Sequence, residues 1–124
     1  MSAENHGAPG LALQTLSIER VAALHRRFGR RFVDRFFTAD ERAFCELRRH
    51  ASQHFAARLA AKLATRRLLG PVALREVEVA RDASGAPSIR LLGGAATRGA
   101  ERRFLLSLSH DGGLAVALVV GEER

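Results

Sequence analysis

The spacing of apolar residues changes from a helical to an alternating pattern at Gly70-Pro71, and this change divides the chain into two halves. Before it, Phe55, Leu59 and Leu63 recur every four residues, the spacing of one face of an α-helix. After it, the segment 76–79 alternates valine with glutamate, which is typical of a strand with one buried face. Helices followed by strands predict an α+β fold, with the helices packed on an antiparallel sheet.

The N-terminal half predicts one strand and three helices. Residues 11–16 form a short apolar run that indicates a strand, and Ser17 can cap a first helix that Gly29 ends or bends. Phe32 to Phe37 supplies aromatic bulk to the core. Thr38 and Glu41 have the spacing of a capping box, which predicts a second helix. The third helix is expected from about Ser52 to Leu69, because glycine and proline follow it.

The C-terminal half predicts a meander of strands. The turn residues Asp82 to Gly85 separate two alternating segments, so we expect a hairpin there. Residues 93–103 are rich in glycine and alanine and indicate a loop or a short helix. Strands are expected at 104–109 and 114–120, on either side of Gly112-Gly113.

Length and composition predict one soluble, cytoplasmic domain. The 124 residues are enough for a single core, which we expect at 10–124 behind a flexible segment at 1–9. No apolar run approaches the roughly 20 residues that cross a bilayer, so no membrane partner is expected. The single cysteine, Cys45, excludes an internal disulfide and a zinc site built from cysteines, and its helical register predicts a buried thiol.

Positive charge is concentrated in the helical half. The net charge is +7, and residues 17–67 alone hold 13 basic and 5 acidic residues. Of the 20 basic residues only Lys62 is a lysine. An excess of this kind indicates an acidic partner, for which nucleic acid and an acidic protein both qualify.

Three short segments carry a resemblance to a known family. They are Phe37 to Glu41, the helical stretch Leu59 to Ala64, and Ser107 to His110; Gly85 to Pro87 adds a Gly-x-Pro turn. In this order and spacing the chain resembles the holo-acyl-carrier-protein synthase family of phosphopantetheinyl transferases. The resemblance spans about Gly10 to Val120, and it implies the phosphopantetheinyl transferase fold.

The resemblance implies transfer of the phosphopantetheine arm of coenzyme A to a serine of an acyl carrier protein, with magnesium bridging the phosphates. In the family two carboxylates hold the metal, and their positions fall on Gln14 and Leu63. Magnesium prefers charged oxygen ligands, so this chain is expected to lack the family's metal site and to need no cofactor, with coenzyme A a possible ligand. A displaced site using Glu19, Glu41 or Asp111 is the alternative.

Several residues of the family pattern remain, and the resemblance gives them roles. Lys62 and Arg67 match catalytic positions, although arginine cannot act as a base where the family has lysine. Arg58 and Lys62, with Arg66 or Arg67, could meet the phosphates of coenzyme A or of the arm, and a solvated basic face is the alternative. The remaining coenzyme A residues implied by the resemblance are Ser107, Ser109 and His110.

The family also implies an assembly and a docking surface. A homotrimer with pockets between subunits is expected, and the acidic carrier protein is expected to dock on the first helix. The docking residues would be Arg20, Arg26, Arg27, Arg30 and Arg31.

Three hypotheses for function follow. The first is a synthase-like protein that binds an acyl carrier protein without normal magnesium-dependent transfer, as a pseudoenzyme or acting on a tethered acyl group. The second is an active transferase with an altered metal site. The third is a basic nucleic-acid-binding module, which is disfavoured because the chain has no Tyr or Trp on which bases could stack.

Overall fold

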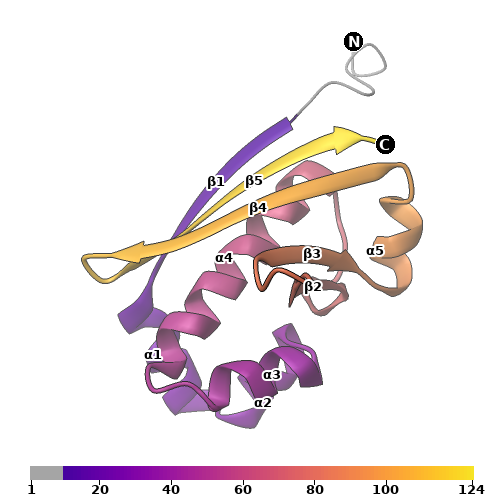
Figure 1. Ribbon diagram of the computed structural model, residues 1–124. Helices are drawn as coiled ribbons and strands as arrows, with labels where there is room; N and C mark the ends of the chain where they lie inside the picture. The colour runs from indigo at the N-terminus through magenta and orange to yellow at the C-terminus, as the bar shows by residue number, and fades with distance from the viewer. Residues whose placement is uncertain (1–9) are drawn as a thin grey trace.

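The computed structural model describes residues 10–124, and the prediction for residues 1–9 lies outside this range. Within it the chain folds as an α+β domain, as predicted (Figure 1). The elements are β1 (Gly10–Ser17), α1 (Ile18–Phe28), α2 (Arg30–Phe36), α3 (Ala39–Glu46), α4 (Ala51–Leu69), the 3-10 helix η2 (Leu74–Glu76), β2 (Val77–Arg81), β3 (Pro87–Leu91), α5 (Gly93–Arg98), β4 (Arg102–Asp111) and β5 (Leu114–Glu123).

The strands form two antiparallel sheets rather than one meander. The larger sheet has the order β1-β5-β4, so the first strand of the chain pairs with the last. The second sheet is the predicted hairpin of β2 and β3, with its turn at Asp82 to Gly85. β3 lies beside β4 without joining its sheet (Figure 1).

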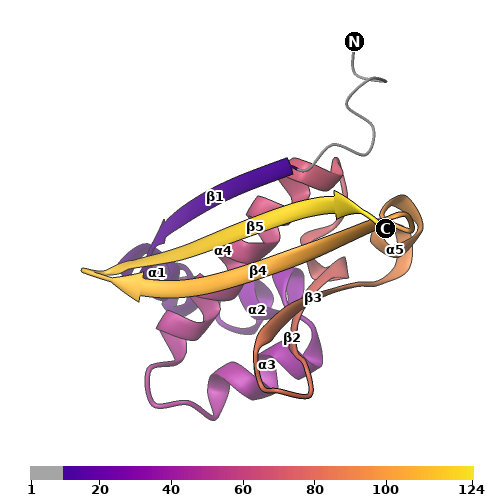
Figure 2. The same cartoon turned by 45° about the horizontal axis from the view of Figure 1, so that its top comes forward.

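Helix α4 packs against one face of the larger sheet and forms the centre of the core (Figure 2). Small residues line this contact: Ala60 and Ala64 of α4 are fully buried, as is Ala117 of β5. Without bulky side chains between them, helix and sheet can approach closely. Most of α4 is buried because α1, α3 and β2 contact its other sides.

The helical half contains one helix more than predicted. The Ser17 cap and the Thr38–Glu41 capping box are both present, as expected. Gly29 ends α1 with a φ of 54°, a conformation that favours glycine, and α2 begins at the next residue. The seven residues of α2 were predicted only as aromatic core, because a helix of two turns gives little periodicity. Its Phe32 packs edge-on against Phe37.

The remaining predictions about single elements and residues can be compared with the structure directly. Residues 93–98 form the short helix α5, one of the two alternatives for that segment. Cys45 is fully buried, and burial raises the pKa of its thiol to about 12, so it is a structural thiol. Among residues 10–124 no helix is long and apolar enough to span a membrane.

Candidate functional site

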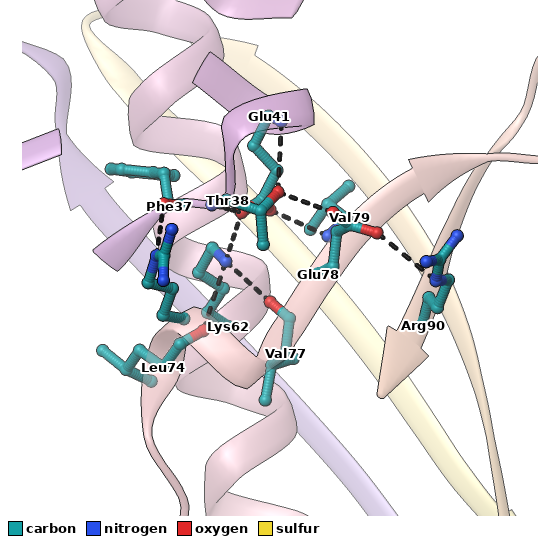
Figure 3. Close-up of polar contacts among 10 residues, drawn as sticks. Phe37, Thr38, Glu41, Lys62, Leu74, Val77, Glu78, Val79 and Arg90 are labelled. Atoms are coloured by element: carbon teal, nitrogen blue, oxygen red, sulfur yellow. Dashed lines mark hydrogen bonds and ion pairs between the residues drawn. The ribbon is translucent and has the colours of Figure 1, made fainter. Parts of the chain in front are cut away.

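The sole lysine of the chain lies in the core. Lys62 Nζ is fully buried and donates to Glu41 Oε1 at 2.6 Å, to the Val77 carbonyl at 2.7 Å and to the Leu74 carbonyl at 3.2 Å (Figure 3). An ammonium group has three protons, and these three acceptors use all of them. Burial lowers the pKa of Lys62, and the charge of Glu41 opposes that shift.

Glu41 is the centre of this network. Its Oε1 also accepts from the Thr38 amide at 2.9 Å, which completes the capping box, and its Oε2 accepts from the Val79 amide at 2.8 Å. Thr38 Oγ1 in turn donates to Glu78 Oε2 at 2.6 Å, and Glu78 Oε1 lies 3.5 Å from Arg90 Nε (Figure 3). The network therefore joins α3, α4 and the β2–β3 hairpin.

This placement bears on the predicted roles of Lys62 and Glu41. The helical spacing of Arg58 and Lys62 suggested one phosphate-facing side of α4, but the Lys62 amine points to Glu41 and has no proton left for a phosphate in this conformation. Its catalytic or phosphate-binding role stays a prediction that its burial disfavours. Glu41 is equally engaged, so it offers no free oxygen to a displaced metal.

Three arginines surround the ring of Phe44 on α3. The Cζ atoms of Arg48, Arg58 and Arg81 lie 3.3, 3.9 and 4.5 Å from the ring centroid, close enough for cation–π contacts. Arg58 is buried, and its Nε has no hydrogen-bond partner. Within residues 10–124 no ion pair links any of the three to a carboxylate, although the charge of Glu41 acts on Arg58.

A cleft of about 220 Å³ opens at this cluster, between α3, α4 and the hairpin. Arg58, Arg81 and Arg90 line it together with Phe44 and with the carboxylates of Asp40 and Glu78, so cations outnumber carboxylates three to two. Burial lowers the pKa of His54. The charges of the three arginines and of His110 lower that pKa further, so His54 lies within electrostatic range of the cluster. This cleft is suited to an anion with several oxygens.

Sequence reasoning found only part of this cluster. Arg58 and His110 were predicted as coenzyme A residues, whereas Phe44, Arg48 and Arg81 were not selected. The i, i+4 spacing of Phe44 and Arg48 was a usable signal, because such pairs meet on a helix surface. Arg81 is distant in sequence, and only the fold brings it to Phe44.

The positions that match the family's metal ligands lie where β1 meets α4. Arg67 Nη1 donates to the Leu13 carbonyl at 2.9 Å and approaches Gln14 Oε1 at 3.4 Å. Leu63, one turn earlier on α4, is partly buried and packs against the core cluster that contains Phe55 and Leu59. A cleft of about 430 Å³ adjoins this edge and is lined by Arg66, Arg67 and residues 70–72.

The residues at this edge do not fit magnesium. Leu63 has no ligand atom, and the one side-chain oxygen of Gln14 is neutral and lies against a guanidinium group. Glu19 of the displaced alternative pairs with Arg26 at 3.5 Å, and Asp111 is exposed at the end of β4. Residues 10–124 contain no group of three His, Cys, Asp or Glu side chains that could hold a metal ion.

The predicted coenzyme A residues of β4 point in two directions. Ser107 and Ser109 alternate with the inward-facing Leu106 and Leu108, so they lie on the outer face of the sheet, while His110 has the opposite register. That outer face is apolar and uncovered in the single chain: Leu11 is 67% exposed and Leu13 57% exposed. Within one chain the structure therefore does not bring Ser107 and Ser109 together with Arg58 and Arg66.

The predicted docking arginines lie on α1 and at the start of α2. Arg26 pairs with Glu19 and Arg30 with Asp34, both at exposed positions where such pairs contribute little stability. A shallow cleft of about 760 Å³ lies beside them. It is lined by the apolar residues Leu24, Phe28, Phe32 and Phe36 and by Arg31, Asp34 and Arg35.

Known proteins of similar sequence and structure agree on one family. No protein-family model matches the chain. Holo-[acyl-carrier-protein] synthases from Paramagnetospirillum magneticum and Desulforudis audaxviator are 42% and 37% identical to it, with alignments that cover 93% and 90% of this chain and 96% and 90% of theirs. The solved complex of the Chronobacterium ammoniagenes synthase with coenzyme A matches at a TM-score of 0.79 and 27% identity, covering 94% of this chain and 98% of the other. With this identity over nearly its whole length, the chain belongs to the holo-[acyl-carrier-protein] synthase family.

Proposed function

We propose that this protein recognises an acyl carrier protein and coenzyme A or a carrier-bound arm, without the normal magnesium-dependent transfer of phosphopantetheine. One observation carries the proposal: at the two positions of the family's metal carboxylates stand Leu63, which packs into the core, and Gln14, whose oxygen faces Arg67. Losing both removes about two negative charges that would face a dication. The protein then acts as a binding scaffold or on a tethered acyl group.

The docking surface is the first support for carrier recognition. Arg31 and Arg35 of α2 line a mostly apolar cleft, and the arginines of α1 lie beside it. An acidic helical protein with a few exposed apolar side chains would match both features. The docking set is Arg20, Arg26, Arg27, Arg30 and Arg31. The long-range charge would speed the encounter, and the phenylalanines of the cleft would supply contact area.

The arginine cluster is the support for coenzyme A binding. Coenzyme A carries phosphate groups, and Arg58 with Arg48 and Arg81 presents guanidinium groups that bind phosphate oxygens in pairs. His110 lies on the same side, since it is among the groups that act on His54. A solved synthase that is 27% identical to this chain is a complex with coenzyme A, which supports coenzyme A as the ligand.

A homotrimer would complete the site. Ser107 and Ser109 lie on an outer sheet face whose neighbours Leu11, Leu13 and Leu118 are exposed in the single chain. An apolar patch of this kind is typical of an interface between subunits. Packing it against a neighbouring copy would place the serines of one subunit at the cleft of the next.

One experiment separates binding from transfer. The protein is mixed with coenzyme A, magnesium and a panel of apo and holo carrier proteins, the products are weighed by mass spectrometry, and complexes are detected by size-exclusion chromatography with light scattering. We expect a carrier complex and no mass increase of the apo carrier protein. A rapid increase by the mass of the arm would refute the proposal.

An active transferase with an altered metal site is the second candidate. The 42% and 37% identity to holo-[acyl-carrier-protein] synthases over most of the chain favours it. It requires a magnesium-dependent mass increase of an apo carrier protein. In that case the double variant Gln14→Asp, Leu63→Glu should be no more active than the original chain.

A further inference from the structure

We propose that Arg67, held by Gln14 and the Leu13 carbonyl, supplies the positive charge at this edge that a metal ion supplies in the family. Phosphate groups of coenzyme A would then bind at Arg66 and Arg67 without a divalent cation. The inference rests on the proposed function, because it takes coenzyme A as the ligand. It goes beyond that function by naming what replaces the metal.

The geometry fixes Arg67 at the place where the metal would be needed. Its Nη1 is held at 2.9 Å by a strand carbonyl and lies 3.4 Å from the amide oxygen of Gln14, on the strand facing α4. Leu63 lies one turn before Arg67 on the same side of α4. One of the two positions that match the family's metal ligands therefore contacts the guanidinium group, and the other lies one turn before Arg67 on α4.

The remaining donors of Arg67 are available to a ligand. Both of its hydrogen bonds use Nη1, and within residues 10–124 neither Nε nor Nη2 has a partner. Arginine binds phosphate through two parallel N–H groups, which a lysine cannot do. Arg67 lines the adjoining cleft of about 430 Å³, where Arg66 adds a second cation.

The local charge opposes a dication. No carboxylate lines the cleft, and neither Arg66 nor Arg67 forms an ion pair with any residue in the described part of the chain. The C-terminal end of α4 carries a partial negative charge that disfavours a phosphate, so the two side chains must supply the attraction. A magnesium ion placed at Gln14 would be repelled by Arg67 and would have no anionic ligand to offset that repulsion.

The test measures coenzyme A binding by isothermal titration calorimetry, once with EDTA and once with excess magnesium. We expect dissociation constants that agree within about twofold, since charged hydrogen bonds to arginine and not a metal provide the affinity. Arg67→Ala should weaken binding at least about tenfold in both buffers. The matched control is Arg42→Ala, which removes an arginine paired with Glu46 on α3 and should leave binding unchanged.

A second variant reverses the substitution. Gln14→Asp with Leu63→Glu restores two carboxylates, and magnesium should now tighten coenzyme A binding by about tenfold or more, because a dication gains two anionic ligands. Binding of Mn²⁺ to this variant, followed by electron paramagnetic resonance, reports the metal without any need for activity. If the double variant fails to fold, the Arg67→Ala comparison still decides.

Each outcome of the test has one meaning. Coenzyme A binding that requires magnesium, or that Arg67→Ala leaves unchanged, overturns this inference and leaves the proposed function standing. Carrier protein is titrated in the same series: metal-independent coenzyme A binding without any carrier binding supports the inference and contradicts the proposed carrier recognition. Absence of coenzyme A binding in both buffers overturns the inference, whereas carrier binding would still support the docking surface.

Discussion

Lys62 and Arg67 lie on successive turns of α4, but the groups around their charges differ. At Lys62 the charge is fully buried and met by the Glu41 carboxylate and two carbonyls. At Arg67 the charge is exposed and met only by a carbonyl and a neutral amide. The first arrangement holds three elements together, and the second leaves donors free for a ligand.

This difference distinguishes residues that stabilise the fold from residues that can bind a ligand. A buried amine without its carboxylate would cost several kcal/mol, so Lys62 and Glu41 are constrained by folding whether or not the protein is an enzyme. At the edge, Arg67 is exposed and Gln14 is half-buried, and a change at either position should affect stability less than a change at the buried pair. A change there alters ligand chemistry while the fold persists.

The largest expected effect comes from breaking the buried pair. Lys62→Met leaves the Glu41 carboxylate in the core without its cation, and we expect a loss of about 3–5 kcal/mol in the free energy of unfolding. Urea denaturation followed by circular dichroism measures it. The double variant Glu41→Gln, Lys62→Met should recover part of the loss, because no charge is then left unpaired. If Lys62→Met alone costs less than about 1 kcal/mol, the pair is not constrained by folding.

The next effect tests Arg58 on α4, which forms no ion pair with a carboxylate within residues 10–124. Arg58→Ala should weaken coenzyme A binding by about 10- to 100-fold, which corresponds to the roughly 1.5–3 kcal/mol of hydrogen bonds to charged groups. Calorimetric titration measures the change. Arg58→Lys should restore the charge only in part, since lysine lacks the planar fork. Unchanged binding in Arg58→Ala would mean that the cleft at Phe44 binds no phosphate group of coenzyme A.

A small effect is expected at the edge. Gln14→Ala removes one long, exposed contact to Arg67, and the free energy of unfolding should change by less than about 0.5 kcal/mol. The same urea titration provides the measurement. If Gln14→Ala lowered the free energy of unfolding as much as Lys62→Met, the edge would be as important for folding as the buried pair.

The smallest effect is a pH dependence at His54. Burial and the charges of Arg58, Arg48, Arg81 and His110 lower the pKa of His54 below its ordinary 6.5. The unfolded chain then binds the proton more tightly, so stability should rise with pH from the lowered value up to about 6.5 and fall as the solution becomes more acidic. Proton NMR of the imidazole gives the pKa, which phosphate bound at the cluster should raise.

His54→Gln is the control for that titration. It should remove this part of the acid-side dependence and leave the stability at pH 8 almost unchanged. An ordinary or raised pKa of His54 in the ligand-free protein would contradict the placement of three arginines around Phe44.

Much of the fold could be predicted because its local signals agree with its tertiary structure. The capping box at Thr38 and the glycine at 70 mark helix ends that the structure confirms. The seven-residue helix α2 was missed because two turns leave no readable period. The pairing of β1 with β5 joins the two ends of the chain, and no local pattern encodes a contact of that sequence separation.

The site was harder to predict than the fold. Spacing placed Arg58 and Lys62 on one side of α4, but this helix is surrounded by other elements, so periodicity does not identify a solvent-facing side. The partner of Lys62 comes from α3, and the cluster at Phe44 needs Arg81 from the hairpin. Only the resemblance to the family selected Gln14 and Leu63, because neither residue carries a chemical signal by itself.

The three guanidinium groups around Phe44 also connect folding with the supply of ligand. Like charges held within a few ångströms of one ring repel each other, and any polyanion that binds only the folded chain shifts the folding equilibrium in proportion to the logarithm of its concentration. The melting temperature is then a property of the solution as well as of the chain. The same sequence would then melt at different temperatures in phosphate-poor and phosphate-rich solutions.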